Sequence, residues 1–171
     1  MSRFSPIEGL VTSVTPLQSG NTSSYCTLLV YIRTRYQEDY QVLVSSSTFV
    51  LDQKPIQQGD TIIAFYDTTA PMPLIYPPQY QAVAVVFPQR GEYAMFDYFD
   101  RNLRNSDNSL VLNLSGSTAM QLPNGQYYMG VPGGQYLLVL YSATTRSIPA
   151  QTTPHRIVIF CSGYSRRSPL L

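Results

Sequence analysis

Residues 59–87 read GDTIIAFYDTTAPMPLIYPPQYQAVAVVF, and residues 134–160 read GQYLLVLYSATTRSIPAQTTPHRIVIF. In each stretch two apolar runs of strand length flank a proline-containing loop, which predicts a β-strand, a loop and a second β-strand. Both stretches keep the same order and spacing, with Met72 and Pro73 as the only insertion. The identical pairs are Gly59/Gly134, Tyr66/Tyr141, Thr69/Thr144, Ile75/Ile148, Val85/Val158 and Phe87/Phe160. Because periodic self-similarity is the signature of a repeat, we interpret the chain as one β-unit built twice.

The first half of the chain is predicted to be all-β. Apolar alternation predicts five strands, and the third is broken by serines 45 to 47, as at the bend of a barrel strand. The predicted strands are 7–17, 25–36, 40–51, 61–67 and 80–87. Pro55 and Gly59 limit any helix between the third and fourth strands to a single turn. This pattern favours an OB-like β-barrel over a plain meander or half of a sandwich, which would have similar spacing.

The second half is predicted to be a second OB-like repeat. VSSSTFV (44–50) matches LSGSTAM (114–120) without a gap. Residues 93–104 fit either a helix or a strand, and the repeat favours a strand over 93–100, with Tyr31 falling near Tyr98. The second repeat then lacks a clear first strand, and we expect the two repeats to pack together. The expected divisions are 1–90 for the first repeat, 91–163 for the second and 164–171 for a frayed tail.

Composition narrows the class of protein. Charged residues make up 12% of the chain, there are 14 tyrosines, and the formal net charge is +1. Such a balance provides no long-range field for nucleic acid or acidic membranes. The N-terminus has no apolar run of signal-peptide length, and no apolar run spans a bilayer, so we expect a soluble cytoplasmic protein without a membrane partner. Cys26 and Cys161 are expected to be free and buried, and no metal site or other cofactor is predicted.

The loop motifs FYDTTAPMPLIYPPQY (65–80) and TTRSIPAQTTP (144–154) resemble those of a group of short, uncharacterised proteins from Firmicutes. The resemblance covers most of the chain. It implies a bacterial protein with an OB-like β-barrel, and it implies no established activity and no catalytic or binding residues.

No arrangement of side chains in the sequence predicts an enzyme. General acid–base catalysis needs paired carboxylates or a histidine held close to a partner, whereas most carboxylates here fall at predicted turns. Asp67 is expected to cap its loop, and its counterpart in the second repeat is Ser142. His155, the only histidine, is expected to be an ordinary residue at the start of a strand. Catalysis therefore ranks last among the functions considered.

Two binding functions remain. The first is a protein-interaction or assembly module, through an unknown partner or self-association. The second is OB-type binding of single-stranded nucleic acid or an oligosaccharide by stacking on the Tyr31/Arg33 face, with Tyr25 on the same strand and Tyr76 and Tyr80 from the framing loop. Tyrosine and arginine are also enriched at protein–protein interfaces, so the same residues fit a protein-interaction surface equally well. A small anion or ligand site is also expected at Thr144, Thr145 and Arg146, while Ile75 and Ile148 are expected to brace the two halves.

Overall fold

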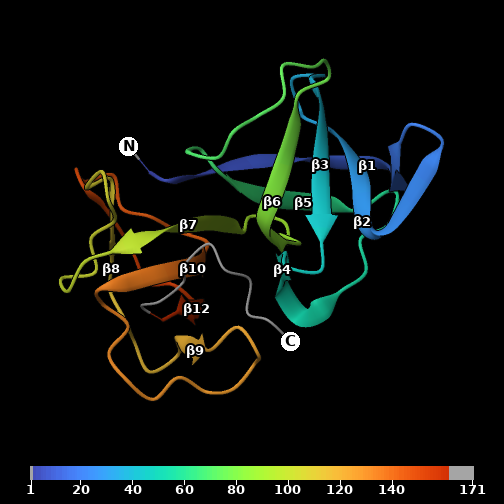
Figure 1. Ribbon diagram of the computed structural model, residues 1–171. Coiled ribbons are helices and arrows are strands. Elements are labelled where there is room, and N and C mark those ends of the chain that lie inside the picture. The colour runs from blue at the N-terminus through green and yellow to red at the C-terminus, as the bar shows by residue number, and fades with distance from the viewer. Residues whose placement is uncertain (1, 162–171) are drawn as a thin grey trace. The chain divides into compact units, whose positions relative to one another are not determined.

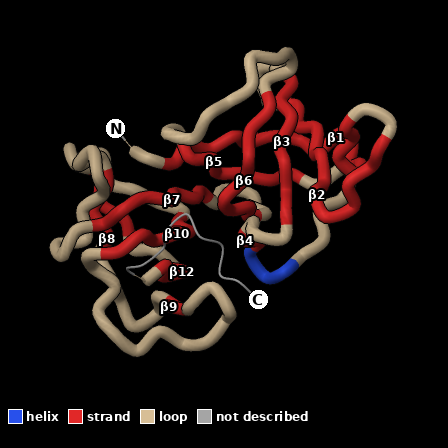
Figure 2. The backbone as a smooth tube through the Cα atoms, in the orientation of Figure 1, coloured by secondary structure: helices blue, strands red, loops and turns tan. Residues whose placement is uncertain are grey.

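The structure, a computed structural model, describes residues 2–161 and is all-β (Figures 1 and 2). It divides into two units. The N-terminal unit is Phe4–Pro88, and the C-terminal unit is the described chain from Gln89 onward together with Ser2 and Arg3. Within the described residues, no helix is long and apolar enough to cross a membrane. The tail expected at 164–171 lies outside the described residues.

Six strands and one short 3-10 turn form the N-terminal unit: β1 (Phe4–Ser19), β2 (Thr22–Arg33), β3 (Asp39–Ser45), β4 (Phe49–Val50), η1 (Leu51–Gln53), β5 (Thr61–Asp67) and β6 (Gln79–Val86). The sheet order is β3-β2-β1-β5-β6-β4, and β3 also pairs in parallel with β6. Strand β1 pairs with β2, β2 with β3, β3 with β6, β6 with β5, and β5 with β1, so the five strands form a ring of pairings. The predicted break in the third strand is confirmed, because β3 ends at Ser45 and β4 starts at Phe49.

Strand β1 changes partner along its length. Its first part, up to Leu10, pairs with β5, and Leu10 also begins the pairing with β2 opposite Arg33. The exchange depends on Gly9, since a Cβ there would lie 2.4 Å from the carbonyl oxygen of Arg33. No side chain fits at that distance, and a glycine is therefore required where the backbones approach so closely.

The core of the N-terminal unit follows strand alternation. Val30 and Ile32 of β2 are buried with Val11 of β1 and Val42 of β3. The expectation that Cys26 and Cys161 are buried is wrong, because both are exposed. Cys26 lies among residues 25–27 of β2, which have no partner in β1 at the register shift between Pro16 and Leu17.

The C-terminal unit is formed by β7 (Tyr93–Phe99), β8 (Leu110–Leu112), β9 (Ala119–Gln121), β10 (Gln135–Tyr141), β11 (Ala150–Thr152) and β12 (Arg156–Phe160). Its main sheet has the order β7-β10-β12-β9, and β8 pairs in parallel with β11. The predicted strand over 93–100 is confirmed as β7. Strands β10, β12 and β9 pair with one another as β5, β6 and β4 do.

The turns at residues 45–48 of the N-terminal unit and 115–118 of the C-terminal unit, which we call the serine turns, have the same hydrogen bonds. In the N-terminal unit, Thr48 Oγ1 accepts the Ser45 N–H at 3.1 Å and donates to the Ala82 carbonyl at 2.9 Å. In the C-terminal unit, Thr118 Oγ1 accepts the Ser115 N–H at 3.3 Å and donates to the Pro154 carbonyl at 2.7 Å. Each threonine thus ties its turn to the strand beside it.

Strand β7 takes the position of the first strand, not the second as the sequence comparison placed it. It pairs with β10 as β1 pairs with β5. Where the N-terminal unit has its second strand, the C-terminal unit has single bridges, from Asn105 to Phe99 and from Arg104 to Val111. Here the Asn105 side chain accepts the N–H groups of Ser109 and Leu110, each at 2.8 Å. A buried side-chain amide therefore binds backbone groups in a segment where the N-terminal unit has a long hairpin.

When the last strands of the two units, β6 and β12, are matched by their pairing register, the match differs by one residue from the alignment by sequence identity. Ile63 pairs with Val86 and Leu138 pairs with Val158, so Val86 corresponds to Val158. By the same register, Tyr76 corresponds to Ile148, and a cis peptide bond to proline follows each of them. The identity pairs Ile75/Ile148, Val85/Val158 and Phe87/Phe160 therefore do not agree with the strand register. Runs of similar apolar residues match almost equally well in neighbouring registers, and identity does not distinguish them.

Candidate interaction surfaces

The Tyr31/Arg33 face lies on the outer side of β2. Tyr31 is half-buried and stands opposite Gln41 of β3, which pairs in turn with Gln79 of β6. Tyr25 is exposed on the same strand, but eight residues of strand separate it from Arg33, about 26 Å at the usual rise. One small ligand therefore does not contact both of these side chains.

Arg33 has a carboxylate partner. Its Nε lies 2.8 Å from Asp39 Oδ1 and its Nη2 lies 3.2 Å from Asp39 Oδ2. This hydrogen bond, with the attraction between the charges, raises the pKa of Arg33 and lowers the pKa of Asp39. The neighbouring turn adds Arg35 and Glu38, so the positive and negative charges at this end of the strand are balanced.

Tyr80 belongs to a different surface from Tyr31. It pairs with Val42, which is buried, and its side chain is therefore on the core side of the sheet. Its ring centroid lies 4.3 Å from that of Tyr66 and 5.7 Å from that of Tyr40. These three half-buried residues form what we call the tyrosine cluster. Burial is the main cause that raises the pKa of Tyr40 and of Tyr80.

The β5–β6 loop, residues 68–78, leaves the strands beside the tyrosine cluster. Asp67 Oδ1 accepts the N–H of Thr69 at 2.9 Å and its hydroxyl at 2.6 Å, which is the loop-capping role expected from the sequence. Leu74 is fully exposed, and Tyr76 is 88% exposed. The loop contains four prolines and no charged residue. It therefore presents apolar side chains on a backbone with few alternative conformations.

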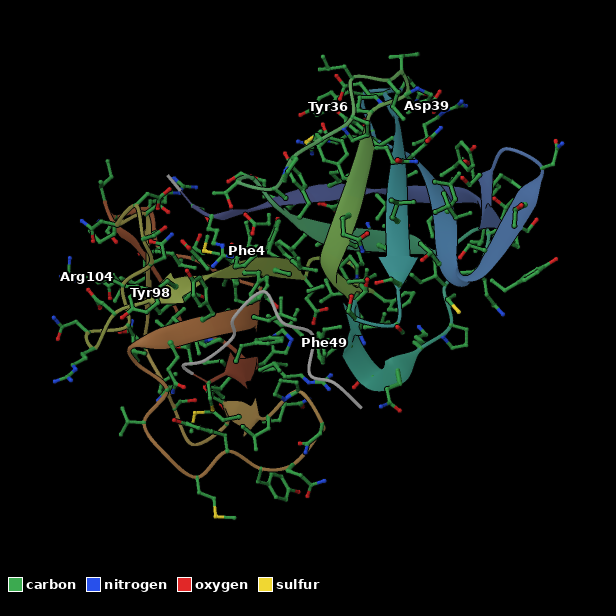
Figure 3. All side chains as sticks on the ribbon, viewed as in Figure 1. Phe4, Tyr36, Asp39, Phe49, Tyr98 and Arg104 are labelled. Carbon is green, nitrogen blue, oxygen red and sulfur yellow. The ribbon has the colours of Figure 1, made fainter. Side chains whose placement is uncertain are left out.

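One end of the N-terminal unit combines this loop with the β2–β3 turn. The Pro78 carbonyl accepts the N–H of Gln41 at 2.9 Å, which joins the end of the loop to β3. Figure 3 places Tyr36 and Asp39 of the turn at the end of the unit where this loop lies. Arg35 lies over the Tyr36 ring, 4.8 Å from its centroid, and the Tyr36 side chain is exposed. We call this end, with the turn 34–38, the tyrosine cluster and the β5–β6 loop, the tyrosine–proline end.

Thr144, Thr145 and Arg146 lie in the C-terminal unit, in the β10–β11 loop. The Thr145 hydroxyl contacts the Ser147 hydroxyl at 2.6 Å and accepts the Gln151 N–H at 2.9 Å, so it stabilises the loop itself. Ile148, in the same loop, is 98% exposed. Ile75 of the β5–β6 loop is also exposed, and the bracing role expected for Ile75 and Ile148 stays a prediction.

A second exposed apolar loop was missed by the sequence reasoning. Between β9 and β10, the side chains of Tyr127, Met129 and Val131 are all exposed. Tyr128 between them is held in place, since its hydroxyl donates to the Val131 carbonyl at 3.0 Å and accepts from Gln135 at 2.9 Å. The sequence signal for this loop is the alternation of large apolar residues in YYMGV (127–131), which is hard to recognise among the neighbouring glycines and polar residues.

His155 has a partner that the sequence did not reveal. Its Nε2 lies 2.6 Å from Glu92 Oε2, at the surface of the C-terminal unit. In the described part of the chain, no three His, Cys, Asp or Glu side chains come together as a possible metal site. Comparison with protein families, with curated proteins and with solved structures gives no match.

Proposed function

We propose that the chain is a non-enzymatic protein-interaction module built on two OB-like units. The ring of pairings in the N-terminal unit, with β3 parallel to β6, is consistent with a five-stranded barrel. The corresponding pairings of the C-terminal unit and the shared serine turns support an internal duplication in which the second copy has lost most of its second strand.

The observation that carries the proposal is the pair of exposed apolar side chains at corresponding positions, Tyr76 and Ile148. Each precedes a proline in an ordered loop, and neither side chain is buried in a core. Together with Leu74 and Met129, they put large apolar groups in water. Contact with a protein partner removes that surface from water, and buried aromatic and aliphatic anchors of this kind contribute most of the binding energy of interfaces.

Site-specific photo-crosslinking in cells that produce the protein tests the proposal. A photoreactive amino acid replaces Leu74 or Met129, and the control replaces the exposed Asn21 at the tip of the β1–β2 hairpin. We expect discrete protein adducts from at least one of the two loops and none from the control. Absence of adducts at both loops would refute the proposed function.

The second candidate function is binding of an oligosaccharide or single-stranded nucleic acid on the Tyr31/Arg33 face. The row formed by Tyr31, Gln41 and Gln79 favours the oligosaccharide, because amide groups bind sugar hydroxyls beside a ring on which a sugar stacks. The ion pair of Arg33 leaves less net charge for phosphates. Titration of linear neutral oligosaccharides and of oligothymidylate tests this function: we expect binding that Y31A weakens and that salt hardly changes. A steep loss with salt identifies nucleic acid instead.

A further inference from the structure

The tyrosine–proline end contains exposed tyrosine rings and exposed prolines, which are the two partners of a common type of protein contact. Tyrosine rings bind proline rings and aliphatic side chains on their faces, as in modules that recognise proline-rich segments. Tyr36 and Tyr76 are exposed at this end, and so are Pro71, Pro73 and Leu74. A surface with both the rings and the prolines fits a second surface of the same composition.

The charges of this end are also self-complementary. The strand end and turn carry two cations, Arg33 and Arg35, and two anions, Glu38 and Asp39. Arg33 and Asp39 already pair within the chain, and a two-fold axis that brings Arg35 of one copy near Glu38 of the other places opposite charges face to face at both equivalent contacts. The β5–β6 loop adds no charge, and the net charge of +1 gives little repulsion between two copies.

We infer that the partner of the tyrosine–proline end is a second copy of this chain, which docks there around a two-fold axis. The inference rests on the proposed function and names its partner. It assigns Leu74 and Tyr76 as the apolar centre of the interface, and Arg35 and Glu38 as the pair that sets its orientation. The C-terminal unit lacks the corresponding surface, because the counterparts of Tyr40 and Tyr80 are the buried Leu110 and Thr152.

Sedimentation velocity of the full chain, from about 1 µM to about 1 mM, tests the inference. We expect the wild-type mass to rise with concentration to that of a dimer. The double variant L74S/Y76S should weaken dimerisation at least about tenfold, since two central apolar anchors are lost. The control L114S changes an exposed apolar side chain of the other unit that belongs to neither proposed interaction loop, and it should leave dimerisation unchanged. All these side chains are exposed, and circular dichroism checks that each variant is folded.

Charge reversal distinguishes docking from a merely structural role. R35E and E38R should each weaken the dimer, because each places like charges across the two-fold axis. The double variant R35E/E38R should restore it, which loss of local structure would not do. A dimer that L74S/Y76S leaves intact, or that L114S abolishes, would refute the assigned surface.

The photo-crosslinking experiment separates this inference from the proposed function. Adducts from position 74 at twice the chain mass of 19.2 kDa support a second copy. A wild-type monomer at every concentration, with adducts of another mass from position 74, overturns self-association and leaves the interaction module standing. A monomer with no adducts from either loop overturns both.

Discussion

The threonine of each serine turn provides a sharp test of the structure. Thr48→Val replaces the hydroxyl with a methyl group of similar size and removes two hydrogen bonds, one to the Ser45 N–H and one to the Ala82 carbonyl. A typical hydrogen bond contributes about 1 kcal/mol net, so the loss should be about 2 kcal/mol. For a unit of this size, that loss lowers the thermal midpoint by roughly 8–16 °C. Thr118→Val removes the same two bonds from the C-terminal unit.

Amide hydrogen exchange, read residue by residue, assigns the loss to one unit. In Thr48→Val, we expect faster exchange at Ser45 and in β6, with the C-terminal unit unchanged. Thr118→Val should show the reverse pattern. Thr22→Val, at an exposed strand end, is the control and should change the free energy of unfolding by less than about 0.5 kcal/mol. A cost below that limit for either turn would contradict the hydrogen bonds, and a large cost in only one unit would contradict their equivalence.

Three further predictions follow from the polar and aromatic groups. Asn105→Ala leaves the buried Leu110 N–H without its acceptor, whereas the Ser109 N–H keeps Asp107 Oδ1, and the variant should lower the free energy of unfolding by about 1–3 kcal/mol in urea denaturation; a loss under about 0.5 kcal/mol counts against this role. Cys26 and Cys161 are exposed and should both react with a thiol reagent in the native state, whereas slow reaction at both would restore the expectation of burial. Burial raises the pKa of Tyr40 and Tyr80 above the ordinary 10.0; because the folded state then holds more protons than the unfolded state, stability should fall as the pH rises above about 10. In a spectrophotometric titration, Y40F/Y80F should reduce the tyrosinate signal that develops above the ordinary range, while Tyr141, whose pKa burial also raises, keeps its share of that signal; an unchanged titration would sink the assignment.

Local patterns in the sequence predicted the all-β class and the bend at the serines, whereas the strand at β7 was predicted only by comparison of the two halves, which aligned it with the second strand instead of the first. The repeat of Ser45, Ser47 and Thr48 as Ser115, Ser117 and Thr118 was visible because these side chains bond within their own turn. Such a motif depends on residues a few positions apart, and the sequence displays them directly.

Features that depend on pairing between distant strands were not predictable in the same way. An apolar strand predicts that Cys26 is buried, yet Cys26 lies in a register shift between β1 and β2 that the sequence does not display, and the thiol is exposed. Because β3 pairs in parallel with β6 and Tyr80 stands opposite Val42, the Tyr80 side chain lies in the tyrosine cluster and not on the Tyr31/Arg33 face. The partners of Arg33 and His155 also come from other strands or loops, so their ion pairs appear only in three dimensions.

The shortened second strand of the C-terminal unit has a consequence for protein engineering. That unit forms its sheets without a long hairpin, and the Asn105 side chain serves backbone groups in its place. The distal part of the β1–β2 hairpin is therefore the part of the N-terminal unit least needed for its ring of strands. A tag or a small domain inserted between Gly20 and Asn21, where the turn is exposed, should leave β5, β6 and the tyrosine–proline end intact. The chain thereby offers a fusion site at the opposite end of β2 from its proposed docking surface.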